Sequence, residues 1–255
     1  MSMKRRTFLG VAGASALAVA GGSSIKALSG GGQEPEEKKA PARWAMVIDP
    51  SKCLKAEGCT KCMMACDKVH NVPQIKDPKH EVKWIWKQSF EKAFPGQEDE
   101  YTAERFKDKP FVLFCNHCDN PPCVRVCPTK ATFKREDGIV MMDWHRCIGC
   151  RYCMAACPYG SRSFNWVDPR PYIPEITLAF PTRTKGVVEK CTFCEERLTA
   201  ENPQPPACVE ACEEKAMVFG NLEDPQSEVR QLLKDRYSIR RKPELGTQPE
   251  IYYLV

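Results

Sequence analysis

The chain has 255 residues, a formal net charge of +5 and a hydrophobic content of 42%, which are ordinary values for one large globular domain or two small ones. Basic and acidic residues are mixed along the chain, and no basic stripe is interleaved with aromatic side chains, so we expect no nucleic-acid partner. The unusual value is the cysteine count of 16, beside 21 prolines and 15 glycines, which predicts irregular and tightly turned chain.

Residues 1–40 are predicted to be an export signal followed by a linker. An Arg-Arg-x-Phe-Leu motif begins at Arg5, and the apolar run that follows at residues 11–20 is too short to span a bilayer. The motif resembles the twin-arginine signal, which implies export of an already folded protein that carries its cofactor. An ordinary secretory signal is the alternative. Residues 21–39, rich in Gly, Ser, Glu and Lys, are typical of a flexible linker.

The first cysteine group is followed by a long stretch without cysteine. Residues 67–114 are long for a connection between two compact cysteine groups, so we interpret them as an insert and as a candidate docking surface. Val82, Trp84 and Trp86 occupy alternate positions there, which predicts a strand. Such a tryptophan pair is more often part of a core than a contact with a partner protein. The cysteines of this first group are Cys53, Cys59, Cys62 and Cys66.

The second and third groups are separated by a predicted hairpin. Residues 131–143 alternate around Asp137-Gly138, a strong turn signal. Short helices are expected after Cys66 and Cys157, at the ends of the first and third groups. The second group is Cys115, Cys118, Cys123 and Cys127, and the third is Cys147, Cys150, Cys153 and Cys157.

The fourth group precedes a C-terminal tail, predicted at residues 225–255. The tail ends in the strand-like sequence EIYYLV, which either folds back onto the domain or pairs with another subunit. His117 and His145 lie beside cysteines of the earlier groups, and we expect them to be neighbours of a metal site or surface residues. The fourth group is Cys191, Cys194, Cys208 and Cys212.

Disulfides and zinc are the alternatives to iron for these cysteines. An even cysteine count in an exported chain suggests disulfides, but C-x2-C-x2-C crowds three sulfurs onto one turn of chain. Disulfide frameworks also serve domains too small to build a core. Structural zinc sites usually combine two separated C-x2-C pairs. Neither alternative explains the spacing well.

The third group instead has the spacing of an iron–sulfur site. Residues 147–158 run C-x2-C-x2-C-x3-C-P, the bacterial ferredoxin pattern for a 4Fe-4S cluster, and the second group is a close variant ending in Cys127-Pro128. Sixteen thiolates at four per cluster predict four 4Fe-4S clusters. In two-cluster ferredoxins the fourth cysteine of a run ligates the other cluster. By this rule the predicted ligand sets are centre 1 (Cys53, Cys59, Cys62, Cys212), centre 2 (Cys66, Cys191, Cys194, Cys208), centre 3 (Cys115, Cys118, Cys123, Cys157) and centre 4 (Cys127, Cys147, Cys150, Cys153).

The predicted fold class is therefore α+β, with duplicated bacterial ferredoxin-like dicluster domains and irregular inserts. Much of the folding energy should come from metal–thiolate bonds. The sequence contains no nucleophile–base pair, phosphate-binding glycine loop or flavin motif, which favours an electron carrier over a catalyst. Within a domain at residues 41–255, the predicted units are a central dicluster unit at 115–157 and a second unit formed by 53–66 with 191–212.

The four cysteine groups, the leader and ACPYGSRSFN resemble the four-cluster iron–sulfur subunits of the dimethyl-sulfoxide-reductase type. More narrowly, RWAMVIDPSKC, FCNHCDNPPCVRVCPTK and RRKPELGTQPEIYYLV resemble the ferredoxin-like O subunit of the membrane complex associated with dissimilatory sulfite reduction. The resemblance covers roughly residues 43–255. The cysteine motifs carry the broad resemblance, and the other stretches carry the narrow one.

The resemblance implies an electron-transfer subunit on the periplasmic face of the cytoplasmic membrane, held there by its partners. The implied partners are an integral membrane quinone-reactive subunit, a multihaem cytochrome c and further membrane and cytoplasmic iron–sulfur subunits. Electrons would pass between menaquinone and those redox centres, in connection with sulfite or sulfur metabolism. The electron-transfer subunit of a molybdopterin oxidoreductase is the alternative within this class. A structural protein stapled by redox-silent clusters is the alternative from a different class.

The first cysteine group departs from the family pattern. It reads C-x5-C-x2-C-x3-C, so residues 55–57 look like an insertion in the cluster-binding loop. We expect Cys53 to reach its iron through the wider loop. If Cys53 does not bind, centre 1 becomes a three-iron cluster or takes an unusual ligand.

Overall fold

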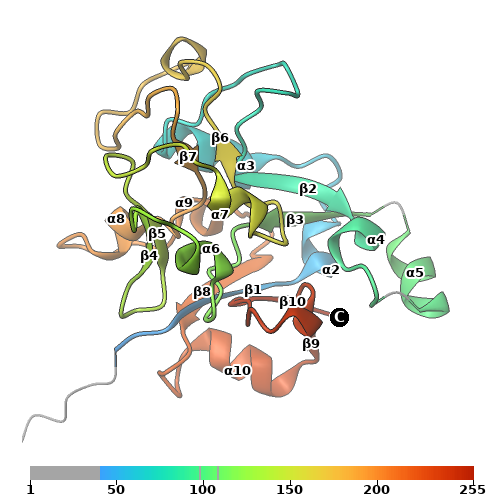
Figure 1. Ribbon diagram of the computed structural model, residues 1–255. Helices are drawn as coiled ribbons and strands as arrows, with labels where there is room; N and C mark the ends of the chain where they lie inside the picture. The colour runs from blue at the N-terminus through green and yellow to red at the C-terminus, as the bar shows by residue number, and fades with distance from the viewer. Residues whose placement is uncertain (1–40, 98, 108) are drawn as a thin grey trace, which may run out of the picture. The chain divides into compact units, whose positions relative to one another are not determined.

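The computed structural model describes residues 41–97, 99–107 and 109–255. The predicted leader and linker, residues 1–40, lie outside this range. Short helices and four small sheets alternate along the described chain (Figure 1), as the predicted α+β class requires. The strands are β1 (Trp44–Ile48), β2 (Ile85–Ser89), β3 (Pro110–Phe114), β4 (Thr132–Lys134), β5 (Val140–Met142), β6 (Ser163–Phe164), β7 (Val188–Glu189), β8 (Met217–Asn221), β9 (Ser238–Ile239) and β10 (Ile251–Leu254). The helices are α2 (Pro50–Cys53), α3 (Lys61–Val69), α4 (Phe90–Ala93), α5 (Glu100–Phe106), α6 (Pro122–Arg125), α7 (Tyr152–Ala155), α8 (Glu195–Leu198), α9 (Ala207–Glu210) and α10 (Glu228–Asp235), with 3-10 turns η1 (Arg170–Tyr172) and η2 (Pro243–Leu245).

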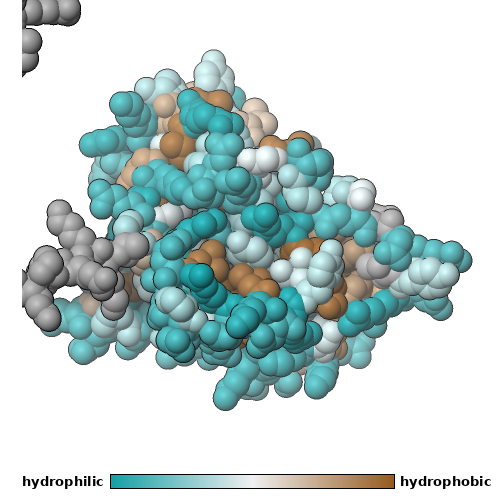
Figure 2. Space-filling view, turned by 90° about the horizontal axis from the view of Figure 1, so that it is seen from below, coloured by the Kyte–Doolittle hydropathy of each residue, from teal (hydrophilic) through white to brown (hydrophobic). Residues whose placement is uncertain are grey.

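The largest sheet has the order β8-β1-β10-β9 and joins the two ends of the described chain. β1 pairs antiparallel with β8 and parallel with β10, so the C-terminal tail folds back into the middle of the sheet. Tyr253 of β10 is fully buried, and its hydroxyl donates to the Val112 carbonyl at 3.0 Å. α10 covers this sheet with Val229 buried against it. The face of the molecule turned toward the viewer in Figure 2 is largely hydrophilic, with hydrophobic side chains in its hollows.

The main hydrophobic core is aromatic and is built largely by the predicted insert. Phe90, Phe94, Phe106 and Phe111 pack with ring centroids 5.2 to 5.4 Å apart. Trp84 is 1% exposed in the same core, as expected for a core tryptophan. The strand there begins only at β2, after Trp84, because the backbone of Lys83 hydrogen-bonds the Ser163 hydroxyl instead of a neighbouring strand.

The predicted hairpin is confirmed, and one of the two predicted short helices is wrong. β4 and β5 pair antiparallel around Gly138, whose φ of +84° suits glycine. α3 runs through Cys66 and continues to Val69. α7, by contrast, ends at Ala155, and a turn follows Cys157 because Pro158 lacks a backbone donor.

Two helix pairs bring the cysteine groups together. α3 packs against α9, which joins the first group to the fourth, and α6 packs against α7, which joins the second group to the third. Among the described residues, no helix has both the length and the apolar character needed to cross a bilayer.

Candidate iron–sulfur centres

All sixteen cysteines lie in the described part of the chain as free thiols, and their burial differs from centre to centre. Every cysteine of centre 2 is buried, and three of the four in centre 3 are buried. In centres 1 and 4 only Cys62 and Cys153 are buried, and the other cysteines are partly exposed. The two interior centres and the two outer centres therefore sit in different dielectric surroundings.

The four predicted ligands of centre 1 line one cavity, together with Met64 and Met217. Burial and, to a smaller extent, the charges of the other three cysteines raise the pKa of Cys62 to about 11. The inserted residues 55–57 form a turn: Gly58 has a φ of +71°, and the Cys59 amide donates to the Ala56 carbonyl at 3.1 Å. The insertion therefore leaves Cys53 beside its predicted partners.

Centre 2 lies deepest in the described structure. Burial raises the pKa of Cys66 well above its usual value, and the charges of the three other cysteines of the centre add to this effect. Backbone amides donate to the sulfurs of Cys191 and Cys194, at 3.4 Å from Phe193 and 3.3 Å from Ala207. Such amide–sulfur bonds stabilise an anionic metal site.

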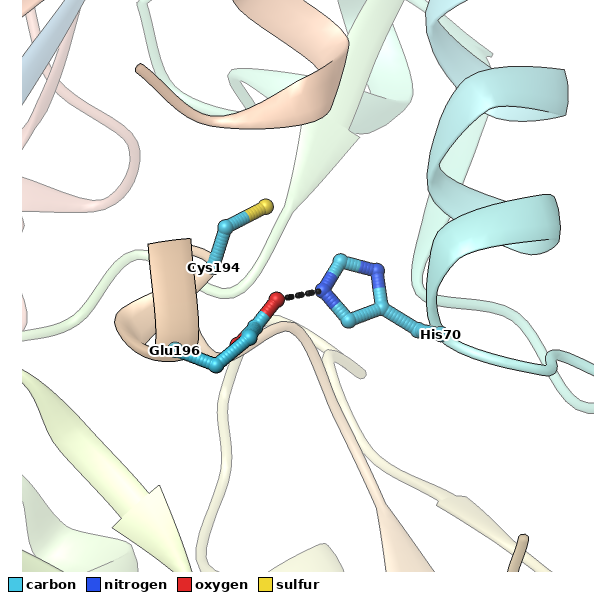
Figure 3. A group of neighbouring side chains, drawn as sticks. All are labelled: His70, Cys194 and Glu196. Atoms are coloured by element: carbon cyan, nitrogen blue, oxygen red, sulfur yellow. Dashed lines mark hydrogen bonds and ion pairs between the residues drawn. The ribbon is translucent and has the colours of Figure 1, made fainter. Parts of the chain in front are cut away.

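His70 borders centre 2 and was not expected to do so from the sequence. Figure 3 shows its ring pointing toward Glu196, with the sulfur of Cys194 nearby. Nε2 lies 3.0 Å from Glu196 Oε1, and Nδ1 lies 3.0 Å from the Cys66 carbonyl and 3.5 Å from Cys66 Sγ. Burial lowers the pKa of His70, but hydrogen bonds to Cys194 and Glu196 outweigh it and raise the pKa to about 9. His70 is the C-cap of α3, four residues after Cys66, and this spacing is the signal that could have identified it.

The other two candidate histidines play different parts. His117 is buried and stacks on Phe193 with ring centroids 3.7 Å apart, while its Nδ1 accepts the Val140 amide at 3.1 Å. His145 is exposed, and its backbone amide donates to Asp143 at 2.9 Å.

Centre 3 has a small cavity lined by all four of its predicted ligands, with Asn116 and Arg162 beside them. Burial raises the pKa of Cys118, and the charges of the other three cysteines raise it further. Both side-chain polar atoms of Asn116 and Nη2 of Arg162 are buried without a hydrogen-bond partner in the described chain. Buried polar atoms are rarely left unpaired, so this cavity fits a polar group that the protein itself does not supply.

Centre 4 lies near the surface around a small hydrophobic cluster that includes Val140 and Val188. Cys153 is buried in this cluster, and Cys127 and Cys147 pack against it. Burial alone would raise the pKa of Cys127, but hydrogen bonds, among them the Thr132 amide at 3.4 Å, lower it. The fourth predicted ligand, Cys150, is partly exposed and precedes α7.

Pairs of cysteines from different centres are also close enough to interact. Cys62 of centre 1 raises the pKa of Cys208 of centre 2. Cys115 of centre 3 does the same to Cys191 of centre 2, and Cys123 of centre 3 does so to Cys153 of centre 4. In each case burial is the larger cause. These three electrostatic interactions indicate the order 1-2-3-4 for the predicted centres.

The cysteine arrangement fits metal clusters by its chemistry. Buried thiols with raised pKa values do not ionise side by side unless a cation binds them, and iron supplies that cation in iron–sulfur clusters. Two of the predicted ligand sets each line a cavity of their own, as a cluster held by four sulfurs requires.

Comparison with known proteins supports the same conclusion. The family model described as a 4Fe-4S dicluster domain matches residues 109–170. The Hdr-like menaquinol oxidoreductase iron-sulfur subunit 1 of Archaeoglobus fulgidus is 42% identical, over 98% of this chain and 97% of the relative. The menaquinone reductase iron-sulfur cluster-binding subunit of Nitratidesulfovibrio vulgaris is 38% identical, over 85% and 90%. The putative iron-sulfur subunit of the dimethyl sulfoxide reductase of Halobacterium salinarum is 38% identical, over 83% and 78%.

These relatives are iron–sulfur subunits of oxidoreductases, which carry electrons and are not themselves the catalysts. The cysteine spacing, the two cavities that are each lined by four cysteines, and the extent of these matches all indicate the same family. The chain belongs to the family of iron–sulfur electron-transfer subunits of the dimethyl-sulfoxide-reductase type.

Proposed function

We propose that this chain is the periplasm-facing electron relay of a respiratory membrane complex, with four 4Fe-4S clusters held by the sixteen cysteines in the sets centre 1 to centre 4. Each cluster, when bound, accepts and releases one electron without making or breaking a bond to substrate. The relay connects a membrane quinone-reactive subunit with other redox centres of the complex, in a pathway linked to sulfite or sulfur metabolism.

The observation that carries this proposal is the linear order of the cysteine sets together with their burial. The two sets at the ends of the order are partly exposed, and the two inner sets are buried. An electron relay needs both features, because its ends must come close to partner proteins while its middle must be kept from water and oxidants. A protein that used clusters only as folding staples would need neither exposed ends nor a continuous order.

The residues of this chain hold and screen the proposed clusters. Backbone amides donate to the sulfurs of Cys191, Cys194 and Cys212 at 3.3 to 3.4 Å. The aromatic side chains of Trp84, Phe180 and Phe193 fill the interior beside centre 2 and exclude water. The chain therefore acts by positioning and insulation.

Two relatives have names that include menaquinol or menaquinone, which supports a quinone-reactive partner for this chain. Oxidation of a menaquinol releases two electrons and two protons, so the partner must divide the pair into single electrons for this relay. A multihaem cytochrome c and further membrane and cytoplasmic iron–sulfur subunits complete the proposed complex.

The test begins with anaerobic measurement of iron and acid-labile sulfide per chain. We expect about sixteen of each, and interacting paramagnetic signals from several reduced clusters after addition of dithionite. Zinc, or iron at well under half of that amount, would contradict the four-cluster relay. Clusters that are present but resist reduction would support the structural alternative instead.

The second candidate is the electron-transfer subunit of a molybdopterin enzyme. It is favoured by relatives named as subunits of dimethyl sulfoxide, arsenate respiratory and tetrathionate reductases. Purification of the intact complex separates the two candidates. Haem with the complex supports the first proposal, and molybdenum in a large partner subunit supports the second.

Export by the twin-arginine route is tested with the leader itself. Replacement of both Arg5 and Arg6 by lysine should keep the protein in the cytoplasm with its iron bound, because a receptor reads the arginine pair. Export of this variant at the normal level would contradict the twin-arginine assignment and favour an ordinary secretory signal.

A further inference from the structure

Three cationic side chains are buried around centre 3. Arg162, Lys190 and Arg241 are 5%, 0% and 3% exposed. They come from three separate segments: the stretch after Cys157, the end of β7 and the C-terminal tail. Buried Lys and Arg side chains are rare unless their charge is compensated.

The hydrogen bonds of these cations go to neutral oxygens and, for Arg162, also to the sulfurs of Cys123 and Cys153. Lys190 Nζ donates to the carbonyls of Val140 and, at 2.7 Å, Cys191. Arg241 Nε donates to the Ala93 carbonyl at 3.0 Å. Arg162 Nη1 donates to the Thr132 hydroxyl at 3.1 Å and lies 3.8 Å from a methionine sulfur.

No carboxylate forms an ion pair with any of the three in the ranges that the structure describes. Arg183 is equally buried, but a carboxylate balances its charge, because its guanidinium lies 2.7 Å from Glu189. Moreover, Nη2 of Arg162 and Nη1 of Arg241 still lack an acceptor in this part of the chain. The missing negative charge must therefore come from something other than a protein carboxylate.

The sulfurs of centre 3 lie where that negative charge is needed. Each cysteine of centre 3 interacts electrostatically with at least one of the three cations. Arg162 and Lys190 both interact with Cys115 and Cys123. Arg241 interacts with Cys118 and Cys157. Arg162 also faces Cys153 of centre 4, and Lys190 also faces Cys191 of centre 2.

The surroundings of centre 1 have the opposite charge. Its cavity is lined by Glu57, Glu213 and Glu214, against one lysine, Lys61, whose side chain is 53% exposed. Lys87 also faces Cys53. These groups lie at the surface, where water screens them.

We propose that Arg162, Lys190 and Arg241 give centre 3 the highest reduction potential of the relay. Transferred electrons then reside at buried centre 3 rather than at the partly exposed centres 1 and 4. This inference rests on the proposed function. Reduction adds one electron and hence one negative charge to an already anionic cluster, with no bond broken and no proton required. Fixed positive charges in a low-dielectric interior favour that reduced form.

The test is a redox titration, followed by paramagnetic resonance, of the full chain carrying its clusters. The variants Arg162→Met, Lys190→Met and Arg241→Met each remove one buried charge. We expect all three to lower the same midpoint potential, the highest in the wild type. Each should change the ratio of oxidised to reduced cluster at fixed potential at least tenfold, which is about 59 mV for a one-electron couple. Two variants should also lower a second potential: Arg162→Met that of centre 4, because Arg162 faces Cys153, and Lys190→Met that of centre 2, because Lys190 faces Cys191.

Two control variants separate charge from shape. Arg162→Lys keeps the buried charge and should keep the wild-type potentials to well within a tenfold ratio. Arg125→Gln removes an exposed arginine two residues from Cys123. The Arg125 guanidinium donates to the Asn120 side chain at 2.6 Å. Its removal should leave the potentials unchanged, because its charge is screened by water.

The outcomes that overturn the inference differ from those that overturn the relay. Variants with a full iron content and an unchanged highest potential, or variants that each shift a different signal, overturn the inference. If one variant binds less iron, the other two carry the test. If all three variants lose iron, the cations are needed for assembly of the cluster, and this result also overturns a role in setting its reduction potential. Too few clusters in the wild type would overturn the four-cluster relay and leave this comparison valid for centre 3.

Discussion

Centres 1 and 3 have the same predicted ligands, four cysteine sulfurs, in opposite surroundings. Centre 1 lies in a surface cavity with carboxylates and methionines around it, and three of its cysteines are partly exposed. Centre 3 lies in the interior beside three buried cations. The comparison teaches that the protein environment, through burial and charge, makes chemically identical sites different.

The largest expected effect is on folding, and it should distinguish the two centres. Cys118→Ser removes a buried ligand of centre 3 and should cost about 4 kcal/mol or more, since loss of a buried metal site is among the most destabilising changes. Cys59→Ser, at the partly exposed centre 1, should release iron while the aromatic core stays folded. Circular dichroism during thermal unfolding measures both. Equal stability of the two variants would mean that the buried centre 3 contributes no more to folding than the partly exposed centre 1.

The next effect tests which cysteines belong to which centre. Cys127→Ser should remove iron from centre 4 alone, from about sixteen to about fifteen if a three-iron cluster remains and to about twelve if the cluster is lost, because Cys127 is proposed to complete centre 4 while centre 3 keeps its ligands. Thr129→Val is the matched control, since the Thr129 hydroxyl lies 3.7 Å from Cys127 Sγ without being a ligand. Full occupancy of both central clusters in Cys127→Ser would show that the crossover rule does not hold here.

A smaller effect is expected at the inserted loop of centre 1. Cys53→Ser should reduce the iron content by about one and produce a three-iron signal in the oxidised protein. Lys55→Ala, in the exposed turn, should leave iron and signals unchanged. Cys53→Ser with a full iron content would mean that Cys53 is not a ligand.

The smallest effect lies next to centre 1, where Asp49 begins α2. Its side chain accepts the Ser51 amide at 3.0 Å and lies 2.6 Å from Arg236. Burial would raise the pKa of Asp49, but the Arg236 interaction and the amide bonds lower it. The stabilisation is therefore present at neutral pH and is lost as pH falls below about 4, through the folded-state pKa.

Asp49→Asn should cost about 1 kcal/mol in denaturant unfolding at pH 7, because Arg236 is partly exposed. Asp235→Asn, an exposed carboxylate near the end of α10, should cost nothing measurable. An equal loss in both variants would mean that the Asp49–Arg236 ion pair does not stabilise the fold.

The cysteine groups could be predicted from the sequence because their spacing is local. A run such as residues 147–158 places three ligands of one cluster and one ligand of its neighbour by local spacing alone, and the Asp137-Gly138 hairpin follows from turn chemistry alone. The turn after Cys157 was missed, although Pro158 signalled it. The spacing of His70 from Cys66 was a local signal that was also missed, but its contacts with Glu196 and Cys194 join residues more than a hundred positions apart and could not be predicted.

The sequence by itself determined that the chain would hold iron–sulfur clusters, because cysteine number and spacing limit the possible metal chemistry. Only the tertiary structure decided how those sites differ. It placed β10 in the middle of the main sheet, gathered Arg162, Lys190 and Arg241 around centre 3, and left the outer centres near the surface. The physical reason is that burial and electrostatic interaction depend on distance in space, which local spacing does not encode.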